Sequence, residues 1–238
     1  MMATVSIPSR FNGPPLSGNG GYSCGLLAAF IDGPARVRLH VPPPLDRELR
    51  VVEAQTGRVE MYDGDTLVGS GVSARETIAP PVAPSQAKAA DAANRYIGRH
   101  GHPLGTCFVC GPDRPARDGL ELFTGPVEDW SLLACTWQPA DDLLDDAGNV
   151  RPEFVWAALD CPGYFAAIGS DLRLALLGEL YAELHAPVPG GEPLVVFSWP
   201  IGEDGRKLYA GAAVATRDGN ILACSRSTWI LPKDKVVD

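Results

Sequence analysis

The segment Leu39-His40-Val41-Pro42-Pro43-Pro44 recurs later in the chain as Leu184-His185-Ala186-Pro187-Val188-Pro189, and this repeat decides the predicted fold. The shift between the two copies is constant at 145 residues, as between His40 and His185. The same shift relates the apolar residues that follow, in 49–51 and 194–196. A constant offset over this many positions is the signature of an internal duplication. We therefore predict two copies of one structural unit.

Each predicted copy begins with one apolar helix, over 22–30 and 154–168, and the second is apolar nearly all round, which indicates burial. Asp63-Gly64 and Asp218-Gly219 are typical hairpin turns, because glycine accepts positive φ without steric cost. Strands are predicted on both sides of these turns, over 36–41, 49–54, 58–62 and 66–73 in the first copy and 174–185, 194–199, 207–216 and 221–231 in the second. Before the helices, strands are predicted at 4–11, 120–123 and 131–137. This order predicts an α+β fold with two antiparallel sheets, each wrapped around a buried central helix and placed edge to edge.

The stretch 79–102 divides the two copies. It opens with a proline-rich run that resists both helix and sheet, and it continues from Gln86 with a composition that favours a helix. We predict a first half over 1–78, a linker with a short helix over 79–102, and a second half over 103–238.

Composition excludes several classes of protein. The 238 residues are 45% apolar and 21% charged, which is typical of a globular chain. The net charge is −9 without a long basic run, so a nucleic-acid partner is not expected. No apolar stretch is long enough to span a bilayer, so no membrane partner is expected either. Without an export signal, the six cysteines are interpreted as reduced thiols, and we expect a cytoplasmic protein.

Three segments resemble the hotdog-fold thioesterase superfamily. Cys107-Phe108-Val109-Cys110-Gly111, followed by Gly119-Leu120, resembles the opening region of phenylacetate-pathway type thioesterases. Arg151 to Asp160 resembles the helix start and acid of that family. Asn19-Gly20-Gly21-Tyr22 resembles the helix start of acyl-CoA thioesterases with a tandem hotdog. Together the resemblance covers about 11–231 and implies a double hotdog that acts on acyl-CoA or another acyl thioester, with no metal or organic cofactor.

The two copies depart from the family pattern in complementary ways. The family has His-Gly-Gly at the helix start and an acid nine residues later. The first copy keeps the glycine pair after Asn19 but has Ala28 at the acid position, whereas the second copy has Pro152-Glu153 at the helix start and keeps the acid as Asp160. Nine helical residues rise about 13 Å, so one helix cannot bring both groups to one carbonyl. We therefore predict a single composite active site between the halves.

The resemblance and the chemistry of thioester hydrolysis assign roles. Backbone N–H groups at the Gly20-Gly21 helix start would hold the carbonyl oxygen, on which negative charge develops, with Asn19 in the position of the family's His. Asp160 would act as general base or nucleophile, with a pKa raised by its apolar neighbours. Three further residues are predicted to contact the substrate: Tyr22, Tyr164 and Arg151. Arg151 would meet either a CoA phosphate or the nearby Glu153.

Some of these residues also have a purely structural interpretation. Asp160 precedes Pro162-Gly163 and would also suit a kink at the edge of the core, and the glycine pair would also suit a tight helix start. Cys107-x-x-Cys110 with His100 and His102 has the residue types of a zinc site, but a lone pair of this kind is a weak signal, and we expect no metal.

Further groups receive structural interpretations as well. His40 and His185 are interpreted as structural, and Cys161 lacks a histidine that would activate it as a nucleophile. Three functions follow in order: acyl-CoA hydrolysis, non-catalytic binding of an acyl or small apolar ligand, and last a dehydratase, for which the sequence shows no histidine–acid pair. A homodimer through the sheets is a further expectation.

Overall fold

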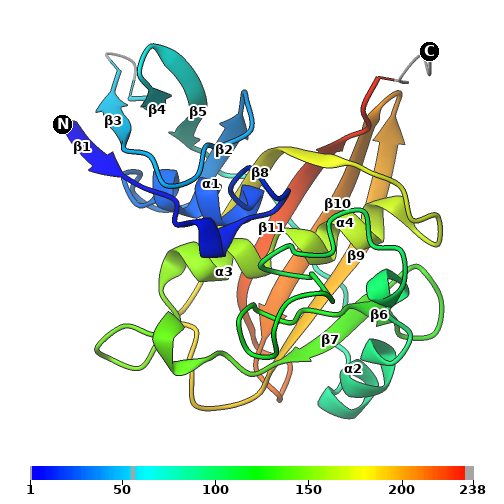
Figure 1. Ribbon diagram of the computed structural model, residues 1–238. Coiled ribbons are helices and arrows are strands. Elements are labelled where there is room, and N and C mark those ends of the chain that lie inside the picture. Colours follow the sequence, from blue (N-terminus) through cyan, green and yellow to red (C-terminus); the bar gives the residue numbers. More distant parts are fainter. Residues whose placement is uncertain (1, 55–56, 234–238) are drawn as a thin grey trace.

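A computed structural model describes residues 2–54 and 57–233, so the predicted halves 1–78 and 103–238 include a few positions outside it. Figure 1 shows an antiparallel sheet with helices packed against it. The helices are α1 (Gly20–Ala28), α2 (Gln86–Ala93), α3 (Pro152–Ala158) and α4 (Cys161–Ile168). The strands are β1 (Met2–Val5), β2 (Ala35–Leu39), β3 (Leu49–Glu53), β4 (Val59–Asp63), β5 (Thr66–Ser73), β6 (Gly125–Pro126), β7 (Leu133–Trp137), β8 (Leu176–Leu184), β9 (Leu194–Asp204), β10 (Lys207–Ala215) and β11 (Ile221–Ile230).

The prediction of two separate sheets is wrong, because the described strands form one sheet in the order β1-β3-β4-β5-β2-β8-β11-β10-β9-β7-β6. The junction is the antiparallel pair β2–β8, in which Arg36 lies opposite Tyr181. These two residues are themselves separated by the 145-residue shift of the repeat. The register therefore places a local two-fold relation at this pair. Hydrogen bonds across it join what the sequence predicted as two sheets into one.

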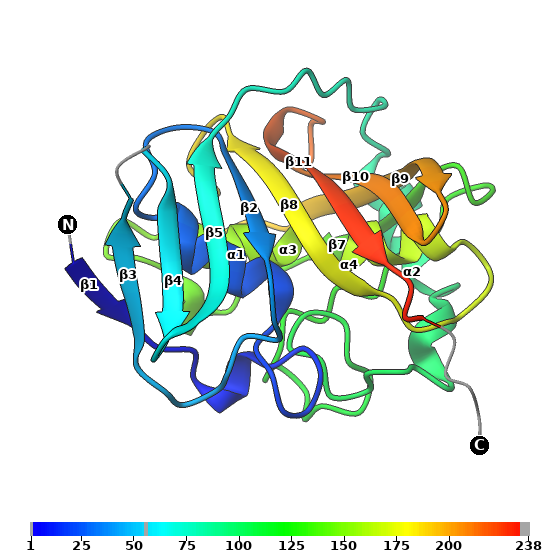
Figure 2. The same cartoon turned by 90° about the horizontal axis from the view of Figure 1, so that it is seen from above.

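The sheet curves around α1, α3 and α4, which lie on one of its faces (Figure 2). Helices α1 and α3 pack unusually closely because Gly21 and Gly25 face α3. A Cβ atom on Gly25 would lie 2.6 Å from the Glu153 Cα, and one on Gly21 would lie 2.6 Å from the Trp156 carbonyl oxygen. Small residues four apart on one helix face allow such close approach of two backbones. This contact brings the start of α1 to the end of α3.

Helix α2, predicted as a linker helix, covers the opposite face of the sheet. Ala89 and Ala92 of α2 form a second apolar cluster with side chains of β7, β9 and β10. Side chains alternate along β9, so that Val196 joins the main core while Phe197 faces α2. This part of the outer face is therefore occupied by the chain itself and is not open for a partner.

Most predicted elements are present, with three differences. The predicted strand over 4–11 is a strand only in β1, which ends at Val5, and Ser9–Phe11 form a 3-10 helix. Residues 120–123 form no strand, and the chain from 103 to 124 runs through turns and extended segments. The predicted helix over 154–168 is divided into α3 and α4 by Leu159 and Asp160. Within the described ranges, every helix is too short to cross the hydrocarbon core of a bilayer.

Candidate functional site

Asp160 lies at the break between α3 and α4. Its backbone has φ −86° and ψ −84°, outside the helical region, and Pro162 follows at the start of α4. Proline lacks the N–H group that would continue the α3 hydrogen-bond ladder, so the helix is interrupted here. The Asp160 side chain makes no capping hydrogen bond to α4. Its carboxylate is therefore available to a different element.

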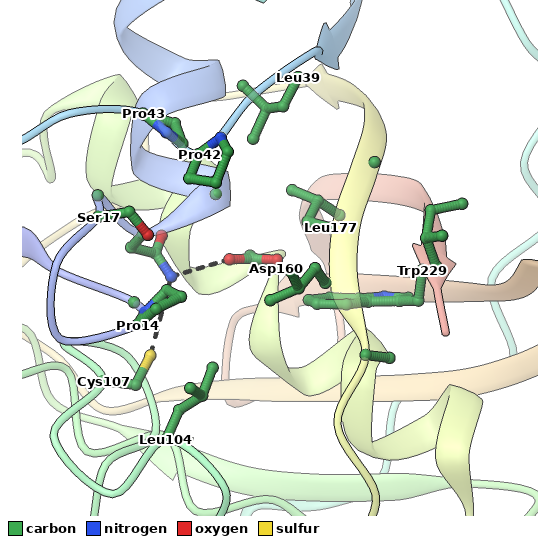
Figure 3. Close-up of a pocket in the computed structure, with 18 of the residues that line it drawn as sticks. Pro14, Ser17, Leu39, Pro42, Pro43, Leu104, Cys107, Asp160, Leu177 and Trp229 are labelled. Carbon is green, nitrogen blue, oxygen red and sulfur yellow. Dashed lines mark hydrogen bonds between the residues drawn. The ribbon is translucent and has the colours of Figure 1, made fainter. Parts of the chain in front are cut away.

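That element is the start of α1. Asp160 Oδ2 accepts a hydrogen bond of 2.9 Å from the Gly21 N–H. It accepts another of 2.9 Å from the Asn19 side-chain amide, which is the dashed line at Asp160 in Figure 3. Free N–H groups and the positive end of the helix dipole make a helix start a favourable place for a carboxylate. The structure thus brings Asn19, Gly20 and Gly21 of the first copy together with Asp160 of the second.

Asn19 connects several parts of the site. Its Oδ1 accepts a 2.8 Å hydrogen bond from the Tyr22 N–H and so caps α1. Its Nδ2 donates to Asp160 and also lies 3.9 Å and 3.8 Å from the sulfur atoms of Cys107 and Cys161. Asn19 is 1% exposed, so these contacts are shielded from bulk water. One amide group therefore fixes both the helix start and the carboxylate.

The Gly21 position admits no side chain. A Cβ atom there would lie 2.5 Å from the Asp160 Cβ and 3.0 Å from the Ala157 Cα. Real Cβ atoms do not approach other atoms this closely without displacing them. The glycine is therefore what allows the Gly21 N–H to reach the carboxylate.

Asp160 is buried, with 2% of its surface exposed. Burial raises its pKa to about 7, although the hydrogen bonds from Gly21 and Asn19 act in the opposite direction. Its Oδ1 atom has no hydrogen-bond partner among the described residues. An acid with a pKa near neutrality and one unpartnered oxygen has the properties of a general base or nucleophile.

A cavity of about 250 Å³ adjoins this carboxylate. Its walls come from both copies and are mainly apolar, which is typical of sites for small molecules. Figure 3 shows Leu177, Trp229 and the Pro42–Pro43 turn around Asp160. The cavity is also lined by Asn19, Gly20, His40, Cys107 and Cys161.

The structure does not bring three predicted substrate contacts to this cavity. Tyr22 packs its ring against Phe11 and Phe154, with centroids 4.6 Å and 5.4 Å away. Tyr164 donates its hydroxyl to the Arg173 carbonyl at 2.6 Å.

Arg151, the third of these residues, lies 3.6 Å from Glu153 at the start of α3. Of the two partners predicted for Arg151, a CoA phosphate and Glu153, this contact is to Glu153. None of the three lines the cavity. The sequence does not determine the direction of these side chains, because rotamers depend on the surrounding packing.

The sequence interpretation missed two cavity residues. His40 lines the same cavity as Asp160, although the sequence showed no histidine–acid pair. Its Nε2 lies 2.8 Å from the Ser70 hydroxyl, and burial lowers its pKa. Trp229 closes another side, with its indole N–H donating to Ser227 at 2.9 Å. No signal in a single sequence relates 40 and 229 to position 160.

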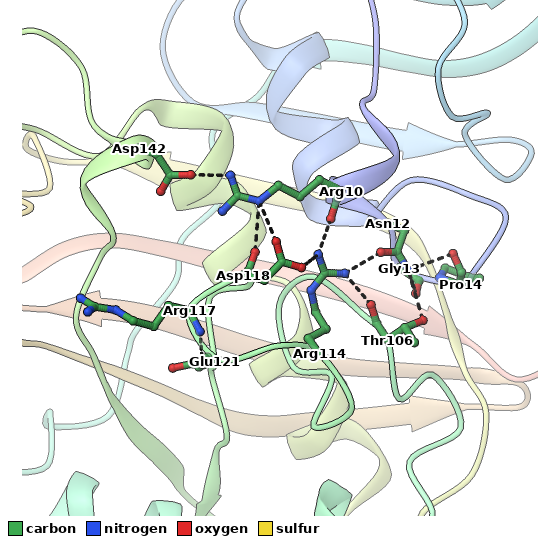
Figure 4. Close-up of polar contacts among 10 residues, drawn as sticks. All are labelled: Arg10, Asn12, Gly13, Pro14, Thr106, Arg114, Arg117, Asp118, Glu121 and Asp142. Carbon is green, nitrogen blue, oxygen red and sulfur yellow. Dashed lines mark hydrogen bonds and ion pairs between the residues drawn. The ribbon is translucent and has the colours of Figure 1, made fainter.

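Cys107 reaches the cavity because an arginine network fixes its loop (Figure 4). Arg114 donates to the Asn12 side chain and the Thr106 carbonyl, both at 2.8 Å, and to the Arg10 carbonyl at 2.9 Å. It also pairs with Asp118 at 2.5 Å. Because Arg114 is only 10% exposed, the network is only weakly screened by solvent. It holds the cysteine loop against the segment before α1.

No family model matches the chain, and no curated protein matches it at a significant level. Solved structures do match, and they have the hotdog fold of TesB-type thioesterases. This chain therefore has that fold.

Three solved structures illustrate the similarity. The tesB protein of Mycobacterium avium subspecies paratuberculosis is 15% identical with a TM-score of 0.63, covering 98% of this chain and 93% of that one. The acyl-CoA thioesterase II TesB2 of Mycobacterium marinum is 10% identical with a TM-score of 0.63, covering 93% and 92%. A conserved protein of unknown function with a hotdog fold from Alicyclobacillus acidocaldarius is 12% identical with a TM-score of 0.61, covering 98% and 94%. At these identities the likeness concerns the fold.

Proposed function

We propose that the protein hydrolyses acyl-CoA thioesters at one composite site between two hotdog halves, 1–78 and 103–238. The observation that carries the proposal is the buried Asp160 carboxylate, held by the Gly21 N–H and Asn19 at the wall of a cavity. The hotdog neighbours support it, among them TesB2 of Mycobacterium marinum, which is described as an acyl-CoA thioesterase. The β2–β8 register, with Arg36 opposite Tyr181, supports the division into two related halves.

Asp160 carries the chemical step in this proposal. Its Oδ2 is held by two donors, so the carboxylate has one orientation, and Oδ1 is the oxygen left to react. As a general base, Oδ1 takes a proton from a water that attacks the thioester carbon, and the CoA thiolate then leaves and is protonated. As a nucleophile, Oδ1 attacks that carbon itself and forms an anhydride, which water hydrolyses. Both routes require the ionised carboxylate.

The structure modifies the predicted oxyanion site. The Gly21 N–H is engaged by Asp160, so it is not free for the carbonyl oxygen. The preceding Gly20 lines the cavity, and its N–H has no acceptor in the part of the chain that the structure describes. We propose that the Gly20 N–H, at the positive end of α1, stabilises the oxyanion. One such donor typically contributes about 3 kcal/mol to lowering the barrier.

The cavity favours an acyl group of modest size. At about 250 Å³ it lies just below the usual range for drug-sized ligands, and its walls offer few polar partners beyond the Asp160 region. Short-chain or aromatic acyl groups therefore fit this volume better than long fatty acyl chains.

A non-catalytic role in binding a small apolar ligand is the second candidate. The engagement of the Gly21 N–H by Asp160 favours it, since this amide would otherwise be an oxyanion donor. Binding with no turnover of any thioester would select this candidate.

The test is a panel of acetyl-, hexanoyl-, phenylacetyl- and palmitoyl-CoA with a thiol-trapping dye. Because all six cysteines are buried, the dye should report released CoA with little background. We expect turnover that is greatest for the smaller acyl groups and falls at least tenfold in Asp160→Asn, as the loss of a general base implies.

Asp146→Asn is the matched control, since it makes the same change at an exposed position in 145–149, away from the cavity. It should keep full activity. Equal rates in Asp160→Asn and the native protein would remove Asp160 from the mechanism.

A further inference from the structure

Three buried sulfur atoms meet beside the candidate site. Cys107 and Cys110 belong to the loop before β6, and Cys161 is the first residue of α4, 54 residues after Cys107. Their Sγ atoms all lie within 4.8 Å of one another, and Cys107 and Cys161 are 3.6 Å apart. Thiolates bound tetrahedrally to zinc at about 2.3 Å lie about 3.8 Å from each other. The sulfur spacing thus approaches that of a metal site without any change of backbone.

The Cys107–Gly111 loop has the shape of a metal-binding turn. The Gly111 N–H donates to the Cys107 carbonyl at 2.8 Å. A Cβ atom on Gly111 would lie 2.5 Å from the Cys107 nitrogen, so this tight turn requires glycine. The turn therefore holds two of the three clustered thiols, Cys107 and Cys110, in one fixed loop.

Side chains around the cluster donate hydrogen bonds to the sulfur atoms. His102 Nδ1 accepts a 2.8 Å hydrogen bond from the Leu104 N–H, so in the neutral ring the hydrogen is on Nε2. That Nε2 lies 3.3 Å from the Cys110 sulfur, and His102 is therefore a donor to the sulfur. Asn19 Nδ2 serves Cys107 and Cys161 in the same way. Such outer contacts to ligand atoms are typical of protein metal sites.

We propose that Cys107, Cys110 and Cys161 bind one zinc ion as three thiolates. The three thiol protons pass to solvent as the ion binds, and a small ligand from the cavity side, which Cys107 and Cys161 line, completes the tetrahedron. The ion ties the cysteine loop to the start of α4 and so fixes one wall of the cavity. The proposal does not depend on thioester hydrolysis.

The test uses the full chain purified without chelators from zinc-supplemented medium, with bound metal measured by elemental mass spectrometry. We expect about one zinc per chain. After removal of the metal under reducing conditions, Co²⁺ should give thiolate-to-cobalt charge-transfer absorption and the intense visible bands of a tetrahedral ion. Zinc should then displace cobalt and abolish these bands.

Cys107→Ser, Cys110→Ser and Cys161→Ser should each lower the bound metal at least tenfold. Cys135→Ser is the matched control, because this thiol is equally buried, in β7, but is not part of the cluster. It should retain the metal of the native protein.

Two results would overturn the proposal. One is native protein that takes up no cobalt after full reduction of its thiols. The other is Cys161→Ser with an unchanged cobalt spectrum. Neither measurement uses turnover, so a failure of the zinc proposal is distinguishable from a failure of the thioesterase proposal. The measurement on native protein also does not depend on how well a variant folds.

Discussion

The starts of α1 and α3 occupy comparable places in the two halves, but only the start of α1 has the features of a reactive site. At α1, Asn19 caps the helix, and the following glycines place an N–H group against Asp160. At α3, Arg151 makes no capping hydrogen bond, and Pro152 supplies no N–H group. The Arg151 guanidinium lies instead 4.7 Å from the Phe154 ring centroid. The start of α1 therefore presents donors to Asp160, whereas the start of α3 is part of the packing.

At the C-terminal ends of the two helices, the polar group belongs to α3 and not to α1. Helix α1 ends at Ala28, a residue without a polar side chain, whereas α3 ends just before Asp160. The acid that follows α3 thus faces the donors at the start of α1. In the proposed function these two groups make one complete site, and substitutions at each position test that comparison.

The largest effect is expected at Gly21, where the two helices approach most closely. In Gly21→Ala, the new Cβ atom would overlap Asp160 and the α3 backbone. We expect a loss of about 3 kcal/mol in the free energy of unfolding, measured with denaturant, because overpacking forces the helices apart. Gly191→Ala is the control, since a Cβ atom there meets nothing within 4 Å. Identical midpoints for the two variants would contradict the close contact.

The pH dependence of turnover should be the next largest effect. Because burial raises the pKa of Asp160 to about 7, the carboxyl group is protonated below that pH and ionised above it. The reaction needs the ionised form, so kcat/KM should rise with pH and level off above about 7. Two pH units below the pKa, kcat/KM should be about a hundredfold lower than its value at high pH. The residual activity of Asp160→Asn should not show this rise of kcat/KM with pH. A native profile that is flat from pH 5 to 8 would contradict the role of Asp160 as the reacting carboxylate.

The smallest effect is expected from an attempt to restore the lost acid. Ala28→Asp, introduced into the Asp160→Asn background, places a carboxyl group at the end of α1. Because the facing helix start has Pro152 and lacks the glycine pair, no oxyanion donor is restored there. Turnover should therefore stay within about twofold of Asp160→Asn alone, measured with the preferred acyl-CoA. A tenfold recovery of turnover would show that the end of α1 and the start of α3 can still form an active site.

Local signals predicted much of this arrangement, whereas contacts distant in sequence were only partly predictable. The turns at Asp63-Gly64 and Asp218-Gly219 located the hairpins, because hairpin turns need positive φ and the structure has it at Gly64 and Gly219. Pro162-Gly163 indicated the kink at Asp160. The predicted strand over 120–123 was wrong, since an apolar run also suits a buried extended loop such as the one around Leu122.

Within the site, the duplication made the meeting of Gly21 and Asp160 predictable, because a shared site requires the two half-motifs to face each other. The orientation of Tyr22 and Tyr164 was not predictable, since rotamers depend on the surrounding packing. The third thiol of the sulfur cluster was missed for a related reason. Cys161 belongs to a separate helix, and nothing in its local sequence relates it to Cys107.

The β2–β8 junction has a consequence for how such a site can change over evolutionary time. In a symmetric homodimer every substitution appears twice, so a residue that improves one side of an interface also alters the equivalent place on the other. Here Arg36 and Tyr181 meet within a single polypeptide, and each side is encoded independently. One half is therefore free to specialise in holding a substrate while the other specialises in reacting with it.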